Sequence, residues 1–315
     1  MIAGAAAREY GDHPAARTFV SAMVERHGFD RGALEQLFAT ARYQDAIVAA
    51  MDRPAERVKP WYEYRAIFVT ERRIREGVDF WRANREVLER AQRDYGVDPA
   101  IVVAIIGVET FYGRNMGSFR VLDALATLAF DYPKRSAFFA RELEQYLLLA
   151  REQNLDPTGL KGSYAGAMGF GQFIPSSYRS YAVDYNGDRK ADIWNDPVDA
   201  IGSVANYFAR HGWQPGGPVA VPAQASGTPD PARLNVLARP VLTPAELAAM
   251  GLRPVDQVAE AAAMPLQLDG VDGNEYWLGY ENFYVITRYN HSHRYAMAVY
   301  QLAGELARRM ADAQG

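Results

Sequence analysis

The sequence contains no cysteine among its 315 residues. Disulfide bonds, thiolate metal sites and cysteine nucleophiles are therefore excluded, but the compartment stays open, because a disulfide-free protein folds in either redox setting. An excess of basic residues is also missing: 34 Lys and Arg stand against 38 Asp and Glu, a net charge of −4. Because sequence-independent nucleic-acid binders are normally basic, this charge argues against a nucleic-acid partner.

Long apolar segments and an export signal are missing as well. The longest apolar run, Ile101–Val108, is too short to span a bilayer. The start of the chain shows no charged stretch followed by an apolar one, because Arg8 and Glu9 come almost at once. We therefore expect a cytoplasmic protein or a chain that begins after a removed signal.

Two hydrolase motifs are absent. No pair among the five histidines has the His-Glu-x-x-His spacing of a zinc protease, and Ser176-Ser177 lacks a Gly-x-Ser-x-Gly context. Structural or surface roles are therefore expected for the histidines.

What is present is an ordinary globular composition, with 49% hydrophobic and 23% charged residues. The length allows about two domains. Apolar spacing predicts helices up to residue 95, with one or two amphipathic helices over Glu63–Tyr95. Proline, alanine and glycine dominate 214–275, which predicts a small, partly β module with a helix from Pro244 to Met250. The stretch Tyr276–Tyr289 fits a strand or a helix equally well.

Several helix boundaries carry clear signals. Asp98-Pro99 and Asp196-Pro197 each place an N-capping Asp before a proline at the first helical position. Ser136 starts a helix that should run through Asn154, and Ser292 caps a final helix to about Met310. His27-Gly28 closes the first helical segment.

Glu109 is the sharpest single feature. It lies in the last turn of the helix that starts at Pro99, which is apolar almost all round and should be buried. Burial and the partial negative charge of a helix C-terminus both favour the protonated acid. Glu109 is therefore a candidate general acid; the alternative is a side chain that turns to solvent where the helix ends.

A second constellation is acidic. Asp184, Asn186, Asp188, Lys190 and Asp192 occupy positions 1, 3, 5, 7 and 9 of an EF-hand loop, with a backbone carbonyl expected from Lys190. Two positions depart from the pattern, because Arg189 replaces the glycine at position 6 and Asn195 replaces the glutamate at position 12. The loop is a candidate Ca²⁺ site or a metal-free acidic turn.

A third feature is the glycine-rich segment 159–171. Glycine lets the backbone approach a ligand closely, so this segment fits the wall of a binding cleft. Read by itself, it fits a surface loop at least as well.

Three runs resemble the lytic murein transglycosylase B family: GVETFYGRNMGSFRVLDALATLAFDYPKR at 107–135, LKGSYAGAMGFGQFIPSSYRSYAVDYNGDRKADIWNDPVDAIGSVANYF at 160–208 and ENFYVITRYNHSHRYAMAVYQL at 281–302. The N-terminal helices and LTPAELAAMGL at 242–252 are also similar. The resemblance implies a mainly α (α+β) fold with a lysozyme-like core. It predicts an N-terminal helical domain over 1–95, the catalytic core over 96–213, the β-containing module over 214–275, and a return to the core over 276–315.

The resemblance also assigns residues. Glu109 falls on the single catalytic acid/base of the family. Lys134 and Arg135 fall where the family has basic residues near the peptide stem, and Asp199, alone or together with Asp196, would complete the Ca²⁺ shell. The remaining positions would bind the glycan: Ser163, Tyr164, Gly166, Met168, Phe170, Gln172, Phe173, Tyr207, Tyr289 and Asn290. The aromatic members could equally belong to the core.

The activity that the resemblance implies is cleavage of peptidoglycan glycan strands without water and without a catalytic cofactor, with Ca²⁺ in a structural role. Peptidoglycan and other cell-wall enzymes would be the partners, and the enzyme would work in the periplasm, its export signal or lipid anchor lying before residue 1. Three rivals remain: a hydrolytic muramidase on the same fold, a non-catalytic glycan-binding scaffold and a calcium-responsive interaction protein. An unpartnered buried acid costs stability, so a mere scaffold has no use for Glu109.

Overall fold

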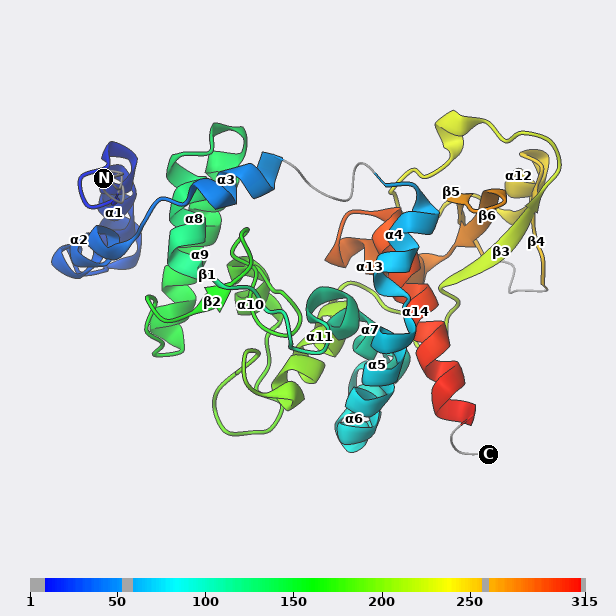
Figure 1. Cartoon of the computed structure of the whole chain (residues 1–315), viewed down its shortest axis with the longest axis horizontal. Helices are drawn as coiled ribbons and strands as arrows, with labels where there is room; N and C mark the ends of the chain where they lie inside the picture. The colour runs from blue at the N-terminus through cyan, green and yellow to red at the C-terminus, as the bar shows by residue number, and fades with distance from the viewer. Residues whose placement is uncertain (1–8, 53–58, 257–260, 313–315) are drawn as a thin grey trace, which may run out of the picture. The chain divides into compact units, whose positions relative to one another are not determined.

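The structure, a computed structural model, describes residues 9–52, 59–256 and 261–312 (Figure 1). Its helices are α1 (Pro14–His27), α2 (Arg31–Thr40), α3 (Asp45–Asp52), α4 (Trp61–Phe68), α5 (Glu71–Ala83), α6 (Arg85–Tyr95), α7 (Pro99–Thr110), α8 (Val121–Phe130), α9 (Ser136–Glu152), α10 (Pro175–Tyr181), α11 (Pro197–Arg210), α12 (Pro244–Ala249), α13 (Glu281–Tyr289) and α14 (His293–Asp312). Its strands are β1 (Phe119–Arg120), β2 (Lys161–Gly162), β3 (Ala220–Ala225), β4 (Leu252–Pro254), β5 (Met264–Gly270) and β6 (Gly273–Gly279). The fold is thus mainly helical with a small β part, as predicted.

The internal contacts divide the chain into two compact units. The first unit combines Met1–Pro54 with Gly113–Ala200, and the second combines Ala55–Tyr112 with Ile201–Gly315. This division follows contacts rather than sequence order. The four-part domain division made from the sequence stays a prediction.

The first unit is built around α8 and α9, which pack against each other along their buried faces. Most of α8 is buried, and α9 contributes Leu143, Tyr146 and Leu147 to the same core. The short antiparallel pair β1–β2 joins Phe119 to Gly162. α10 packs against α9, so the glycine-rich segment between β2 and α10 is held at both ends.

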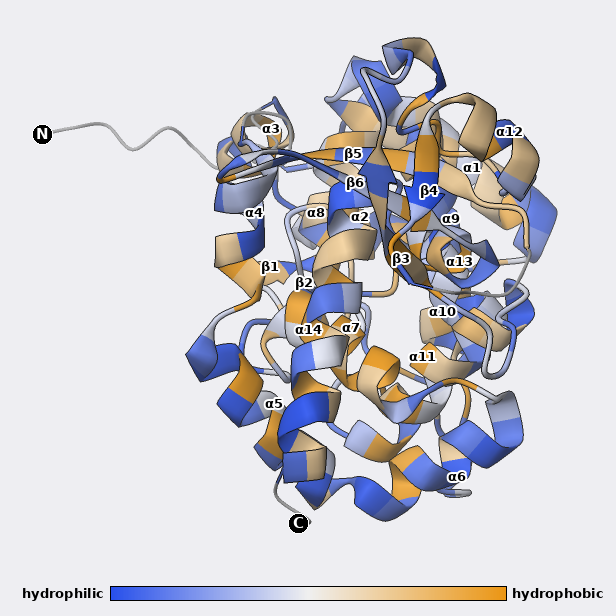
Figure 2. Cartoon of the chain, turned by 90° about the vertical axis from the view of Figure 1, so that its right-hand side faces the viewer, coloured by the Kyte–Doolittle hydropathy of each residue, from blue (hydrophilic) through white to orange (hydrophobic). Residues whose placement is uncertain are grey.

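The second unit is built around α7. Every residue from Pro99 to Val108 is buried, and α7 packs against α5, α6 and α14. Helices α5 and α6 are amphipathic: each carries both hydrophobic and hydrophilic residues (Figure 2). The predicted start of α7 is confirmed, because the Asp98 side chain accepts a hydrogen bond from the backbone N–H of Ala100 at 2.7 Å.

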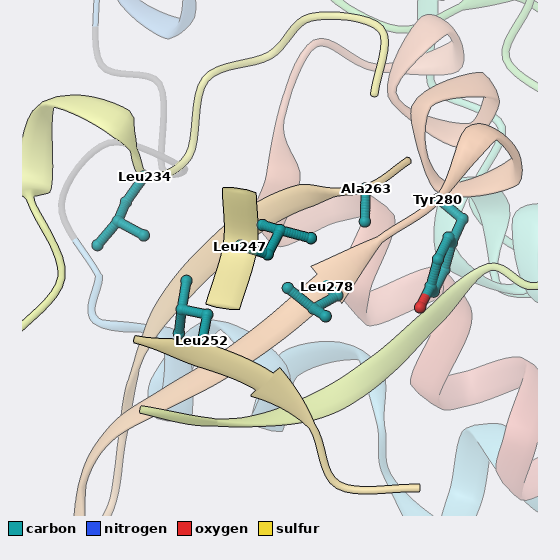
Figure 3. Packing of buried hydrophobic residues seen from close by; sticks show 6 residues of the cluster. All are labelled: Leu234, Leu247, Leu252, Ala263, Leu278 and Tyr280. Carbon is teal, nitrogen blue, oxygen red and sulfur yellow. The ribbon is translucent and has the colours of Figure 1, made fainter. Parts of the chain in front are cut away.

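The β module of the second unit is a four-stranded antiparallel sheet in the order β4-β3-β6-β5. One face packs under α12 around Leu247, Leu252 and Leu278, whose side chains converge in Figure 3. Thr243 forms a capping box with Glu246 at the start of α12. A helix is therefore found where one was predicted, ending at Ala249.

Two other regions resolve ambiguities of the sequence. Glu63–Tyr95 lies in three helices rather than one or two, because Val69 leaves the helical conformation and Thr70 caps α5 by accepting from the N–H of Arg73. The ambiguous stretch Tyr276–Tyr289 is both strand and helix, since β6 runs to Gly279 and α13 starts at Glu281.

Other predicted boundaries hold. Helix α1 ends at Gly28 in the left-handed conformation, and α9 starts at Ser136 and ends two residues before Asn154. Ser292 accepts a hydrogen bond from the N–H of Tyr295 at the start of α14. Among the helices in the described part of the chain, none is long and apolar enough to cross a membrane.

Candidate active site

Glu109 lies where the sequence placed it, in the last turn of α7, and it is partly exposed although its neighbours along the helix are buried. Its Oε1 accepts a hydrogen bond from the hydroxyl of Tyr295 at 2.5 Å. Tyr295 lies on α14 and is 2% exposed. The carboxyl group is therefore held by a buried phenol contributed by the last helix.

A second tyrosine, Tyr289, is also influenced by the charge of Glu109. Burial raises the pKa of Tyr289 well above its usual value, and the charge of Glu109 raises it further. The pKa of Tyr295 is raised in the same way, first by burial and then by Glu109. Both phenols stay protonated over the whole physiological range, so Tyr295 donates to Glu109 rather than competing with it for a proton.

The backbone after Glu109 is held in an unusual conformation. Phe111 and Tyr112 both take positive φ values, 52° and 59°, without being glycine. The Tyr112 hydroxyl donates to the carbonyl of Arg73 at 2.9 Å. A Cβ at Gly77 would lie 2.2 Å, and one at Gly107 2.6 Å, from that hydroxyl oxygen. The two glycines therefore make room for Tyr112, which fixes the chain where α7 ends.

Tyr207 and Tyr289, two predicted glycan contacts, lie together in the second unit. Their ring centroids are 4.7 Å apart, and His211 stacks on Tyr207 at 3.9 Å. The Tyr207 hydroxyl donates to the carbonyl of Arg288 at 2.6 Å, and the side chain is only 7% exposed. Tyr207 therefore packs against Tyr289, which lies near enough to Glu109 for the charge of Glu109 to raise the pKa of Tyr289.

The glycine-rich segment of the first unit is a tight backbone ribbon. A Cβ at Gly117 would lie 2.0 Å from the carbonyl oxygen of Gly162, so these two segments of the chain touch through their backbones. The Ser163 hydroxyl accepts from the N–H groups of Ala165 and Ala167 at 3.2 and 3.1 Å. Ser163 thus stabilises the turn that carries Gly166, which has a φ of 76°.

The other predicted glycan contacts in this segment differ in exposure. Met168 and Phe173 exchange backbone hydrogen bonds and are 0% and 3% exposed, so their side chains are core. Tyr164 is 37% exposed. Gln172 donates to the carbonyl of Gly169 at 3.0 Å. That these residues bind glycan stays a prediction, and for Met168 and Phe173 only the backbone could take part.

The predicted basic pair is engaged within the first unit. Lys134 pairs with Asp52 at 2.7 Å, and this hydrogen bond raises the pKa of Lys134. The Arg135 guanidinium stacks over the rings of Phe138 and Phe139 at 4.5 and 5.1 Å. Both cations lie at the N-terminal end of α9. Binding of a peptide stem there stays a prediction.

The acidic loop brings three carboxylates together. Ligand oxygens of Asp184, Asp188 and Asp199 lie within 4.8 Å of one another. Asp199 is fully buried, and its carboxylate accepts from the N–H groups of Tyr185, Asn186 and Asp192. Burial raises its pKa against those hydrogen bonds, and the charge of Asp196 adds to the rise. Three carboxylates at this spacing repel one another unless a cation lies between them.

The rest of the loop is less suited to a metal. Asp192 caps the following turn by accepting from the N–H groups of Trp194 and Asn195, so its side chain lies outside the three-carboxylate cluster. Asn186 uses its amide N–H to reach Asp196 at 2.6 Å. Arg189 adopts a φ of 75°, the conformation that glycine usually supplies. The departure from the EF-hand pattern at position 6 is thus accommodated by backbone strain.

Three other acidic side chains of the first unit, Glu142, Asp131 and Asp123, accept hydrogen bonds that hold the structure together. Glu142, 4% exposed, accepts from the N–H and the hydroxyl of Ser176 at 2.9 and 2.8 Å. Asp131 accepts from the Tyr10 hydroxyl at 2.7 Å, and Asp123 accepts from the N–H of Arg42 at 3.0 Å. All three stabilise the packing of the first unit.

Comparison of the sequence with known protein families identifies the class of enzyme. The family described as "Transglycosylase SLT domain" matches residues 11–304. The chain belongs to this transglycosylase family, and the resemblance to the lytic murein transglycosylase B enzymes is confirmed. The protein is therefore an enzyme, a lytic transglycosylase with a lysozyme-like fold.

Individual relatives agree. Membrane-bound lytic murein transglycosylase B of Escherichia coli (strain K12) is 48% identical over 311 residues, 95% of this chain and 84% of the relative. The structure of catenated SltB1 from Pseudomonas aeruginosa is 51% identical with a TM-score of 0.91, covering 96% of this chain and 99% of that one. The lytic transglycosylase Slt35 of Escherichia coli, solved in complex with calcium, is 48% identical with a TM-score of 0.87, covering 94% and 93%.

Proposed function

We propose that this enzyme cleaves the β-1,4 bond between N-acetylmuramic acid and N-acetylglucosamine in peptidoglycan and leaves a 1,6-anhydro end. The observation that carries the proposal is the single carboxyl group of Glu109 at the end of a buried helix, held by the Tyr295 hydroxyl. A solved relative supports the product. SltB3 from Pseudomonas aeruginosa, 30% identical with a TM-score of 0.79, covering 92% of this chain and 78% of that one, was solved with NAG-anhNAM-pentapeptide.

In the first step Glu109 donates its proton to the glycosidic oxygen, and the N-acetylglucosamine leaves as an alcohol. The 2-acetamido carbonyl of the muramic sugar stabilises the positive charge at C1, in place of the second carboxylate that ordinary glycosidases use. In the second step ionised Glu109 takes the proton of the sugar's own 6-hydroxyl, and the 6-oxygen bonds to C1. No water is consumed, and Glu109 ends protonated as it began.

Tyr295 serves both steps. The first step requires neutral Glu109, and the second requires its carboxylate. A hydrogen bond from Tyr295 stabilises the carboxylate that forms when the proton leaves. Because burial keeps the Tyr295 phenol protonated, it can donate throughout the cycle. Tyr289 would offer a ring to the sugar beside the acid, with the buried Tyr207 packed behind it, and Asn290, which follows Tyr289, would add a polar contact.

The first unit carries the other residues that the family resemblance assigns to glycan binding. The glycine-rich ribbon from Ser163 to Phe173 would present backbone groups to sugar hydroxyls, with Tyr164 and Phe170 adding ring faces. Lys134 and Arg135 would meet the carboxylates of the peptide stem. These roles rest on the family resemblance and on the tight backbone of the ribbon.

Calcium would be held by Asp184, Asp188 and Asp199, with the carbonyl of Lys190 and the side-chain oxygen of Asn186 as further ligands. The support is the cluster of three carboxylate oxygens within 4.8 Å, one of them on a fully buried side chain. Oxygen donors of this kind suit Ca²⁺. Its role would be structural, bracing the loop that precedes α11, and the acid–base chemistry of Glu109 needs no metal.

Peptidoglycan as the substrate places the enzyme in the periplasm. We propose that it acts there, soluble or lipid-anchored, with glycan strands as its main partner and other cell-wall enzymes as further partners.

The test is mass spectrometry of the muropeptides that the enzyme releases from purified peptidoglycan, with Glu109→Gln beside the parent. Anhydro ends from the parent, one water lighter than reducing ends, and none from the variant, are expected. Reducing ends would identify a hydrolytic muramidase instead. Binding without release by either protein would identify a glycan-binding scaffold.

A further inference from the structure

The face of the β-sheet opposite α12 is only half covered. Cross-strand partners share a face of a sheet, so Leu266, Trp277 and Pro222 form one row across β5, β6 and β3. Leu266 is fully buried on β5, the strand that packs against α4, and Pro222 at the other end of the row is exposed. Trp277 lies between them, half-buried, its ring edge-on to Tyr300 of α14 at 6.4 Å.

The next row on this face is polar. Leu268 pairs with Glu275, and Gln224 pairs with Arg253, so Glu275, Gln224 and Arg253 follow the buried leucine across the sheet. All three polar side chains are exposed. The row thus offers a carboxylate, an amide and a guanidinium in sequence, beside the apolar row of Trp277 and Pro222.

Four members of these rows line an open groove of about 670 Å³: Pro222, Gln224, Glu275 and Trp277. Arg253 follows Gln224 across the sheet but lies outside this lining. The charged side chain of the lining is Glu275, whose carboxylate accepts a hydrogen bond from the indole N–H of Trp277 at 3.4 Å. The groove therefore disfavours an anionic ligand and suits a neutral, polar one.

Pyranose rings match this surface. A β-linked amino sugar has an apolar C–H face, which packs on an indole, and a rim of hydroxyl and acetamido groups, which need both donors and acceptors. In the groove, Gln224 supplies both kinds of group and Glu275 accepts. An open groove admits a polymer that extends beyond its ends.

We infer that Trp277, Pro222, Gln224 and Glu275 form a secondary glycan-binding surface that holds a peptidoglycan strand away from Glu109. The inference rests on the proposed substrate. The surface would raise affinity for polymeric peptidoglycan and leave the cleavage of short fragments unchanged, because short fragments occupy the active site alone.

The test uses the full chain carrying Glu109→Gln, which binds without cleaving, and purified peptidoglycan sacculi as the probe. Adding Trp277→Ala should weaken binding about tenfold, whereas Trp277→Phe, which keeps a ring, should stay within about threefold. Val271→Ala is the matched control, because Val271 is 79% exposed in the turn between β5 and β6, outside both rows. In the otherwise unchanged enzyme, Trp277→Ala should raise KM for sacculi but not for a tetrasaccharide.

A folded Trp277→Ala protein that binds sacculi within twofold of its parent would overturn the inference. If Trp277→Ala fails to fold, the double variant Gln224→Ala/Glu275→Ala decides, with at least threefold weaker binding expected and parental affinity contradicting it. Sacculi stripped of peptide stems should bind equally well, and loss of binding to them would reassign the groove to the stem. If the proposed function itself were wrong, the unaltered enzyme would release no product from sacculi, a result distinct from those of the binding experiments.

Discussion

Two glutamates at helix ends have opposite surroundings. Glu142 faces the N-terminus of α10, where a backbone N–H and the Ser176 hydroxyl both donate to its carboxylate. Glu109 lies at the C-terminus of α7, where the helix presents carbonyl groups, and the phenol of Tyr295 donates to its carboxyl group. A helix N-terminus stabilises a carboxylate and a C-terminus disfavours one. Burial of a glutamate alone therefore does not identify a catalytic acid. Whether its carboxyl group lies at the N-terminal or the C-terminal end of a helix separates the two glutamates.

The largest effect should come from Glu109→Gln. Loss of the acid and base should lower turnover of peptidoglycan about 10³-fold or more, because general acid–base catalysis contributes on the order of 10²–10⁴ and both steps use this group. Release of muropeptides measures the rate, and calorimetry should show a Tm close to the parent's. A Glu109→Gln variant that keeps a tenth of the activity would contradict the catalytic role of Glu109, and with it the distinction from the structural Glu142.

Calcium extends the comparison to Asp199, a buried carboxylate that three backbone N–H groups already stabilise. At a Ca²⁺ concentration 100 times Kd, binding should stabilise the protein by about 2.7 kcal/mol. Thermal unfolding with Ca²⁺ and with chelator measures this difference. Asp199→Asn should abolish it, and equal Tm values for the parent in both conditions would contradict the site.

Glu142→Gln should affect stability rather than catalysis. The amide can still accept from the N–H of Ser176 and can donate to the Ser176 hydroxyl, but two hydrogen bonds to a charged group become hydrogen bonds to a neutral one, at a cost of about 2 kcal/mol. Denaturant unfolding measures the loss, and the activity of the folded fraction should stay within about threefold of the parent. Loss of activity without loss of stability would make Glu142 a second catalytic carboxylate.

The smallest effect should come from Tyr295→Phe, which removes the donor to Glu109 and keeps the ring. Turnover should fall about tenfold, equivalent to about 1.4 kcal/mol. Without that donor the protonated form of Glu109 is favoured, so the alkaline limb of the pH–rate profile should move to higher pH. An unshifted profile would show that the hydrogen bond only orients the side chain. Phe at position 295 is the conservative choice, since Ala would leave a cavity.

The sequence predicted the features that depend on neighbouring residues. Asp98-Pro99 determines where α7 starts, and an all-round apolar helix has to be buried, which places Glu109 at the edge of a core. The family resemblance added the activity. The capping residues Thr243 and Ser292 also act locally, and the helices that follow them were found.

What could not be predicted depends on contacts between distant residues. Tyr295 lies 186 positions from Glu109 and was missed, although it falls within the run 281–302 that resembles the family. The end of α7 is set by Tyr112 fitting over Gly77 and Gly107, which no local pattern reveals. Whether Phe173 was core or cleft stayed open until its burial was known.

The measurement that tests the central claim most directly is digestion of peptidoglycan in H₂¹⁸O, followed by mass spectrometry of the muramic ends. If the 6-hydroxyl attacks C1 and Glu109 accepts its proton, the ends are anhydro sugars that carry no ¹⁸O. Reducing ends with one ¹⁸O at C1 would show that water attacks, and would contradict the transglycosylase mechanism proposed for Glu109.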